Sequence, residues 1–273
     1  MQDTSRGHLL HGRGIGFVPT MGALHEGHLS LVRRAKEEND ITMVSIFVNP
    51  LQFGPSEDFN KYPKDTDGDA DKLRKAEIDV LFMPDASSLY PAGFSTHVEI
   101  EKLSEKLCGA FRPGHFRGVA TIVTKLFNIV APTRAYFGQK DYQQAVIIKK
   151  MVKDLDMGID IVVCPTIREH DGLAMSSRNA YLNEEERKAA TVINKCLVQT
   201  TELIKSGIID IGSIRRFMKE KLSEKPLVTE IQYASVYDPE TLDELERVEK
   251  EALLAVALKI GGTRLIDNML VKV

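Results

Sequence analysis

Short apolar runs rich in β-branched residues alternate with segments of helical periodicity from the start of the chain to about residue 165. The apolar runs, which predict buried strands, lie at 14–20, 41–48, 79–83, 135–137 and 159–165. The segments that predict helices lie at 24–39, 64–77, 118–130 and 141–154. Strands that alternate with helices are typical of βαβ units, so we predict an α/β domain built on a parallel sheet.

The pattern changes after Arg178. Asn183 and Glu186 have the spacing of a capping box, and the helix that they begin is expected to end at Gly207. A second helix is expected at 213–222, and three strands are expected at 229–237, 253–259 and 263–271. We therefore predict two domains, one at residues 1–176 and a smaller α+β domain at residues 177–273.

Composition and charge limit the partners of the chain. A net charge of −3 and an isoelectric point near 6.2 argue against the clustered basic surface that binds nucleic acid. No apolar run reaches the roughly 18 residues of a membrane span, and the N-terminal MQDTSRGHLL lacks the apolar stretch of a signal peptide. Cys108, Cys164 and Cys196 are widely spaced, so we expect free thiols and a cytoplasmic protein that contacts no membrane.

The most informative segment is PTMGALHEGH, from Pro19 to His28. A strand ends here, and His25 and His28 are expected on one face in the first turns of a helix. The positive end of the helix dipole and the backbone N–H groups favour an anion, and Gly27 lets a nucleotide approach closely. The zinc motif HExxH needs histidines at i and i+4, so we exclude a zinc hydrolase. Two surface histidines at a helix start remain the alternative.

Polar residues also follow two later strands. Asn49 and Gln52 follow the second predicted strand, where open parallel sheets bind ligands, so we expect them to contact a small polar substrate. Lys140 and Asp141 open a helix, with Gln144 about one turn further, and they suit contacts with phosphate and ribose. A plain Asn-Pro turn and a capped helix start are the respective alternatives.

Three loops complete the set of candidates. Ser176, Ser177 and Arg178 suit a clamp on phosphates, although an interdomain linker is the alternative. The basic segment 112–118 is expected either to approach phosphates or to cap the helix that follows it. The acidic run 65–71 lacks the glycine and glutamate positions of a calcium loop, so we interpret it as a solvated helix start, with Asp69 as a candidate to assist Mg²⁺.

Taken together, these segments resemble the pantothenate synthetase (pantoate–β-alanine ligase) family. The motifs that carry the resemblance, in the family's order and spacing, are PTMGALHEGH, SIFVNPLQFG, Tyr62-Pro63, RPGHFRGV, FGQKDYQQ, MSSRN and TRLIDN. The resemblance implies a Rossmann-like parallel sheet with helices on both faces, of the HxGH nucleotidylyltransferase type, and a C-terminal lid. It also implies a homodimer that uses ATP and Mg²⁺ to join pantoate to β-alanine through pantoyl-adenylate, releasing AMP and pyrophosphate. The product, pantothenate, is a precursor of coenzyme A.

The same resemblance implies roles for individual residues. The catalytic set is His25, His28, Lys140 and Arg178. The ATP site is Met21, Gly27, Gly138, Lys140, Asp141, Ile167, Met175, Ser176, Ser177 and Arg178. Pantoate is expected between Gln52 and Gln144, with an apolar wall formed by Pro19, Met21 and Phe137. The β-alanine end is expected at Asn49, Gln52 and Tyr62.

Two departures from the family pattern stand out. Only about 15 residues precede IGFVPTMG, so we expect the family's first strand to be absent and residues 1–14 to form the end of its first helix. Gly68 stands where a carboxylate often lies near Mg²⁺, which weakens the case for Asp69. Two rival functions are an adenylyltransferase for a phosphorylated acceptor, which would need more basic residues near Asn49, and a non-catalytic nucleotide-binding protein, which would show degraded motifs.

Overall fold

The computed structural model describes residues 1–55 and 57–273, which fall into two compact units. The first unit comprises Met1–Glu105, Arg112–Gln139 and Gln144–Pro165. The second unit comprises Lys106–Phe111, Lys140–Gln143 and Thr166–Val273. Each unit has its own sheet.

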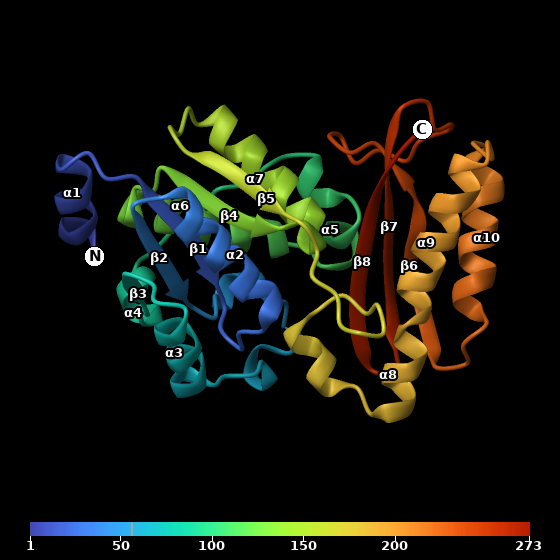
Figure 1. The fold of residues 1–273 in the computed structure, drawn as a ribbon, viewed down its shortest axis with the longest axis horizontal. Helices are drawn as coiled ribbons and strands as arrows, with labels where there is room; N and C mark the ends of the chain where they lie inside the picture. Colours follow the sequence, from blue (N-terminus) through green and yellow to red (C-terminus); the bar gives the residue numbers. More distant parts are fainter. Residues whose placement is uncertain (56) are drawn as a thin grey trace. The chain divides into compact units, whose positions relative to one another are not determined.

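The first unit is built on a five-stranded parallel sheet (Figure 1). Its strands are β1 (Ile15–Thr20), β2 (Ile41–Ile46), β3 (Val80–Phe82), β4 (Arg134–Gly138) and β5 (Asp160–Cys164), in the order β3-β2-β1-β4-β5. The chain moves outward from β1 to β3 and then returns to pair β4 with the other side of β1. The direction of winding therefore reverses between β1 and β4, and ligands of such folds bind at the carboxyl ends of the strands beside this point. The predicted α/β fold and all five of its strands are confirmed.

Helices cover both faces of this sheet. The helices of the unit are α1 (Gln2–Leu10), α2 (Glu26–Glu38), α3 (Thr66–Lys75), α4 (Ala86–Leu89), α6 (His115–Val130) and α7 (Tyr142–Asp154). On one face, Val32 of α2 and Leu73 of α3 pack in a core with Val18 and Val44. On the other, Phe127 of α6 packs edge-on against Phe137 of β4. The helix expected within residues 1–14 is present as α1, which ends at Leu10, and α6 begins three residues before its predicted start at 118.

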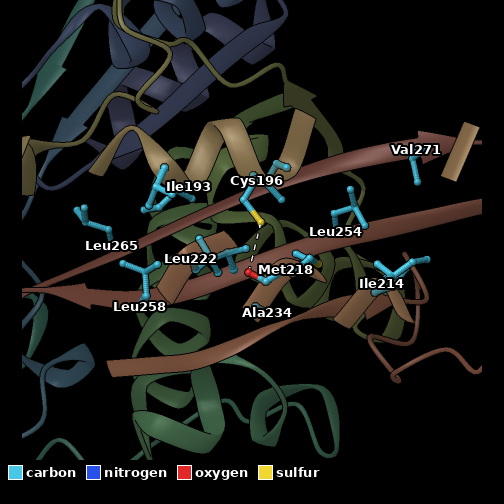
Figure 2. Close-up of a cluster of buried hydrophobic side chains, with 14 of the residues drawn as sticks. Ile193, Cys196, Ile214, Met218, Leu222, Ala234, Leu254, Leu258, Leu265 and Val271 are labelled. Atoms are coloured by element: carbon cyan, nitrogen blue, oxygen red, sulfur yellow. Dashed lines mark hydrogen bonds between the residues drawn. The ribbon is translucent and has the colours of Figure 1, made fainter. Parts of the chain in front are cut away.

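The second unit is an antiparallel sheet with two helices packed on it (Figure 1). Its strands are β6 (Val228–Tyr237), β7 (Glu251–Ile260) and β8 (Thr263–Lys272), and its helices are α5 (Cys108–Phe111), α8 (Glu184–Ala190), α9 (Val192–Lys205) and α10 (Ile211–Ser223). Figure 2 shows the core between α9, α10 and the sheet, where Cys196 donates to the carbonyl of Met218. All three cysteines are free and buried, as expected.

One helix prediction was wrong in its extent. The segment 183–207 forms two helices, α8 and α9, that meet at Thr191. The Thr191 hydroxyl donates to the Lys188 carbonyl at 2.9 Å, and such a bond competes with the helical ladder and bends a helix. The capping box itself is confirmed, because Asn183 Oδ1 accepts from Glu186 N–H at 2.9 Å and the Glu186 carboxylate accepts from Asn183 N–H at 3.0 Å.

Five short 3₁₀ turns connect the elements within the described ranges. They are η1 (Pro50–Gln52), η2 (Phe59–Lys61), η3 (Leu103–Glu105), η4 (Gln139–Asp141) and η5 (Ser177–Tyr181). A search of the described residues finds no helix with the length and apolar character needed to cross a membrane.

The contact between α6 and η1 requires a glycine at position 118, which yields a testable prediction. A Cβ on Gly118 would lie 2.2 Å from the carbonyl oxygen of Leu51 and 2.6 Å from the Gln52 nitrogen, so the backbone would have to move. We expect Gly118→Ala to lower the free energy of unfolding by about 1–3 kcal/mol, measured by urea denaturation. The control is Gly158→Ala, since no atom lies within 4 Å of a Cβ there. Equal urea midpoints for the two variants would contradict this interpretation.

Candidate active site

The turn that connects β1 to α2 has an unusual backbone. Gly22 (φ 83°) and Ala23 (φ 51°) both adopt left-handed conformations, which are unfavourable for a residue that carries a Cβ. Helix α3 supports the next residue, Leu24: Asp69 Oδ1 accepts its N–H at 2.7 Å, and Lys72 Nζ donates to its carbonyl at 2.9 Å. Both polar groups of Leu24 are therefore fixed from outside the turn, and this fixes the start of α2.

The two histidines cap this helix reciprocally. His25 is the N-cap residue, and its Nδ1 accepts from the Gly27 N–H at 3.1 Å. His28 is the third helical residue, and its Nδ1 accepts from the His25 N–H at 3.3 Å. The ring centroids are 4.1 Å apart. The sequence predicted both histidines in the helix, whereas His25 precedes it in extended backbone.

This capping decides which nitrogen of each ring carries hydrogen. Because Nδ1 accepts a backbone N–H in both rings, the hydrogen of each neutral imidazole is on Nε2. Of the backbone N–H groups at this helix start, that of Gly27 donates to His25. Each ring therefore carries an Nε2–H donor at the start of α2, where the helix dipole is positive.

Asn49 and Gln52 follow β2 and belong to one buried network. The Asn49 side chain is buried and donates to Gln52 Oε1 at 3.1 Å and to the Gly118 carbonyl at 3.0 Å. Its Oδ1 accepts from the Tyr90 hydroxyl at 2.8 Å, and burial raises the pKa of Tyr90 well above its ordinary value. Gln52 Nε2 lies 2.9 Å from the sulfur of Met21. The network brings together Met21, Asn49 and Gln52, three of the predicted substrate residues.

The backbone of Gln52 is held from the basic segment before α6. His115 Nδ1 lies 2.8 Å from the Gln52 carbonyl, while Arg112 Nη1 lies 3.0 Å from His115 Nε2. A guanidinium only donates and a carbonyl only accepts, so His115 is neutral with its hydrogen on Nδ1. Gly114 of the same segment is the N-cap residue of α6, without a side-chain cap hydrogen bond, so the segment both begins the helix and holds Gln52.

An ion pair completes this support. Arg112 donates from Nε and Nη2 to the two carboxylate oxygens of Glu57, both at 2.6 Å. Burial alone would raise the pKa of Glu57, but the paired guanidinium holds it below its ordinary value. This two-pronged ion pair fixes the Arg112 side chain, which in turn donates to His115 Nε2.

The other predicted residues of the first unit lie near the ends of its strands. Pro19 is in β1, Phe137 and Gly138 end β4, and Gln144 lies in the first turn of α7. Phe137 is buried, as an apolar wall requires. Tyr62 is also buried, with its ring edge-on to Phe53 at 5.9 Å between centroids.

The predicted phosphate and adenine residues of the second unit lie on two segments. Met175 N–H donates to the Ile167 carbonyl at 3.0 Å, which makes these two residues neighbours. Ser176 caps η5 by accepting from the Arg178 N–H at 3.3 Å, so its hydroxyl shapes the loop. Lys140 Nζ lies 3.8 Å from Asp141 Oδ1 in η4.

Asp69 fits a supporting role better than a metal site. Its side chain is 1% exposed, and its Oδ1 already accepts from Leu24 and lies 3.3 Å from Lys72 Nζ. Among the described residues, no group of three or more histidine, cysteine or acidic side chains has the arrangement to hold a metal.

Sequence reasoning missed the supporting residues. Tyr90 donates to Asn49, 41 positions earlier in the sequence, and Lys72 donates to Leu24, 48 positions earlier. Glu57 supports Gln52 indirectly, through its ion pair with Arg112. Their short-range sequence patterns carry no signal of these contacts. Arg112 and His115 were marked only as members of the basic segment 112–118, and their contacts with Glu57 and Gln52 were not predicted.

Comparison with known proteins identifies the family. Residues 1–270 match the model of the family described as pantoate–β-alanine ligase. The pantothenate synthetase of Thermodesulfovibrio yellowstonii is 61% identical over 272 residues, covering 100% of this chain and 97% of that protein. That of Acetivibrio thermocellus is 54% identical over 263 residues, covering 96% and 93%.

Solved structures of the same family also resemble this chain. The structure of pantothenate synthetase from Thermus thermophilus has a TM-score of 0.91 and 47% identity, covering 94% of this chain and 92% of that one. The Francisella tularensis pantoate–β-alanine ligase, complexed with β,γ-ATP and β-alanine, has a TM-score of 0.80 and 36% identity, covering 98% and 93%. The family match, the relatives and the solved structures together show that the chain belongs to the pantoate–β-alanine ligase family.

Proposed function

We propose that the chain joins pantoate to β-alanine to form pantothenate, and that His25 and His28 bind the phosphates of ATP during the reaction. The observation that carries the proposal is the pair of Nε2–H donors at the N-terminus of α2, beside the carboxyl end of β1. The family match and the ligands named for the Francisella tularensis structure support it.

The first step transfers an adenylyl group. A carboxylate oxygen of pantoate attacks the α-phosphorus of ATP and forms a new O–P bond. The bond between the α-phosphorus and the oxygen that bridges it to the β-phosphate breaks, which releases pyrophosphate. The protein needs no covalent nucleophile, because substrate supplies the attacking oxygen. Its contribution is alignment and stabilisation of the negative charge that develops on the phosphate oxygens. Neutral Nε2–H groups suit that task, since they donate at fixed positions.

Residues of the second unit supply further charge in this proposal. Lys140 and Arg178 contact the phosphates, with Ser177 and the capped Ser176 loop, while Asp141 binds ribose. Ile167 and Met175, neighbours in the structure, form part of the adenine surroundings. When bound, Mg²⁺ would supply additional positive charge at the phosphates.

The second step forms the amide. The β-alanine amine attacks the activated carbonyl, the C–N bond forms, the C–O bond to AMP breaks, and one proton leaves the nitrogen. Gln52 and Gln144 hold pantoate against Pro19, Met21 and Phe137, and Asn49, Gln52 and Tyr62 hold β-alanine. The buried network around Asn49 favours this assignment, because it presents Gln52 in one orientation.

The remaining features follow from the family resemblance. Residues 1–176 act as the nucleotide- and pantoate-binding domain, and residues 177–273 act as a lid that keeps water from the acyl-adenylate. The proposal also includes a homodimer and a cytoplasmic location.

The function is tested by product formation. The purified chain is incubated with Mg-ATP, pantoate and β-alanine, and AMP and pantothenate are measured by chromatography. We expect equal amounts of both products, and only when both acids are present. AMP formation without dependence on pantoate, or ADP in place of AMP, would contradict the proposed reaction.

The role of the histidines is tested by substitution. Removing one preorganised donor to a developing oxyanion typically lowers kcat by about 10²–10³-fold, so we expect losses of this size in His25→Ala and His28→Ala. His25→Asn separates capping from catalysis, because asparagine is a good N-cap residue but is too short to replace the imidazole Nε2–H. We expect it to keep the melting temperature and lose the rate. His11→Ala, at an exposed position after α1, is the control. Wild-type rates in both His25 variants would contradict the assignment of His25.

A further inference from the structure

The TRLIDN motif of β8 has no role in the proposed chemistry, yet it carries two buried polar side chains. Asp267 is 3% exposed and Asn268 is 4% exposed. A buried carboxylate or amide is unfavourable unless hydrogen bonds satisfy it, so the partners of these residues indicate what they do. Both side chains contact segments of the second unit that bear proposed ATP-binding residues.

Asn268 holds the segment that carries Lys140. Its Nδ2 donates to the Lys140 carbonyl at 2.8 Å. Lys140 lies in η4, a single 3₁₀ turn between β4 and α7, and such a turn leaves carbonyl groups without a helical partner. The amide of Asn268 therefore fixes the backbone from which the Lys140 and Asp141 side chains extend.

Asp267 holds the segment that leads to Arg178. Its two oxygens accept from Arg168 Nη1 at 2.6 Å and from Nη2 at 3.1 Å, in a two-pronged ion pair. Arg168 Nη1 also donates to the Gly172 carbonyl at 3.1 Å. Arg168 pairs with Ala174 across the hairpin that brings Ile167 next to Met175. Asp267 thus fixes the base of the loop that continues into Ser176 and Arg178.

The far end of this loop is held by a second network. Asn179 Nδ2 donates to Glu169 Oε1 at 2.7 Å and to the Ala174 carbonyl at 3.1 Å. Glu169 accepts from Arg187 of α8 at 3.0 and 2.6 Å, and these bonds hold the pKa of Glu169 below its ordinary value. Arg178 is therefore flanked by two anchored points, Arg168 and Asn179.

The two β8 residues are linked to each other as well. Asp267 Oδ1 accepts from the backbone N–H of Asn268 at 2.8 Å. Residues 267 and 268 are adjacent on a strand paired along its length with β7, so their backbone positions are fixed by the sheet. One rigid strand therefore sets the positions of both segments.

We propose that Asp267 and Asn268 are positioning residues that hold the Lys140 turn and the Arg178 loop at the spacing required for adenylation. The inference rests on the proposed function, because Lys140 and Arg178 must contact ATP for their spacing to affect the rate. A misplacement of about 1 Å in a reacting arrangement costs up to about 10²-fold in rate. The two residues act through the segments that they hold and do not themselves touch substrate.

The test measures the first step alone, as pantoate-dependent exchange of pyrophosphate into ATP. Asn268→Leu keeps the side-chain shape but removes the donor to Lys140, and Asp267→Asn removes the charge that pairs with Arg168. We expect each variant to lower kcat of exchange by about 10–100-fold. The KM for pantoate should stay within about twofold, because the residues proposed to bind pantoate lie in the other unit. A purely structural defect would lower the melting temperature, and kcat and the pantoate KM would both change.

Controls separate this inference from the proposed function. Ser235→Ala removes a buried hydroxyl on β6 that bonds to Glu244, away from both segments, and should leave exchange unchanged. Asn268→Thr, a residue favoured in strands, replaces Asn268→Leu if that variant does not fold. Exchange is also measured in Lys140→Met and Arg178→Met. Wild-type exchange in these two variants would overturn the proposed contacts of Lys140 and Arg178 with ATP, on which this inference rests. Loss of exchange in them, with exchange within twofold of wild type in folded Asn268 and Asp267 variants, would overturn the positioning role.

Discussion

The candidate site in the first unit depends on how the backbone of Leu24 is held. Asp69 and Lys72 bind its N–H and its carbonyl at 2.7 and 2.9 Å, directly after two left-handed residues. These contacts offset the unfavourable left-handed backbone of Ala23, which costs on the order of 1–3 kcal/mol. They also determine that α2 starts after His25, so that the two histidines cap the helix and carry their hydrogens on Nε2. A buried aspartate thus acts through the backbone on the position of both histidines.

Other predicted site residues show a related arrangement. Asn49 and Gln52 lie on short connections, where backbone carbonyls and side-chain amides are not fixed by regular hydrogen bonding. Groups on neighbouring elements fix them instead: Tyr90 and the Gly118 carbonyl at Asn49, and His115 at the Gln52 carbonyl. In the second unit, β8 does the same for the Lys140 turn and the Arg168 hairpin. Functional side chains on loops keep precise geometry when a supporting layer on rigid elements holds them.

Sequence reasoning predicted the parts of this structure that local patterns determine. Hydrophobic periodicity located every strand of both sheets, and the capping signal at Asn183 placed α8. The break at Thr191 was missed, because it depends on one side-chain bond to Lys188 that competes with the helix. The motifs supplied the candidate site residues, but not the finding that His25 precedes its helix, since helix starts are uncertain by a residue or two. The pairing of Arg112 with Glu57 joins residues 55 positions apart and depends on the tertiary fold.

The central claim is that the pantoate carboxylate attacks the α-phosphorus of ATP beside the two capping histidines. It is tested most directly with pantoate labelled with ¹⁸O in both carboxylate oxygens, followed by mass spectrometry of the products. The account predicts one ¹⁸O atom in each AMP, because the oxygen that attacks phosphorus stays on it when the amide forms. Label in inorganic phosphate, or AMP without label, would show that the carboxylate does not attack the α-phosphorus and would contradict the account.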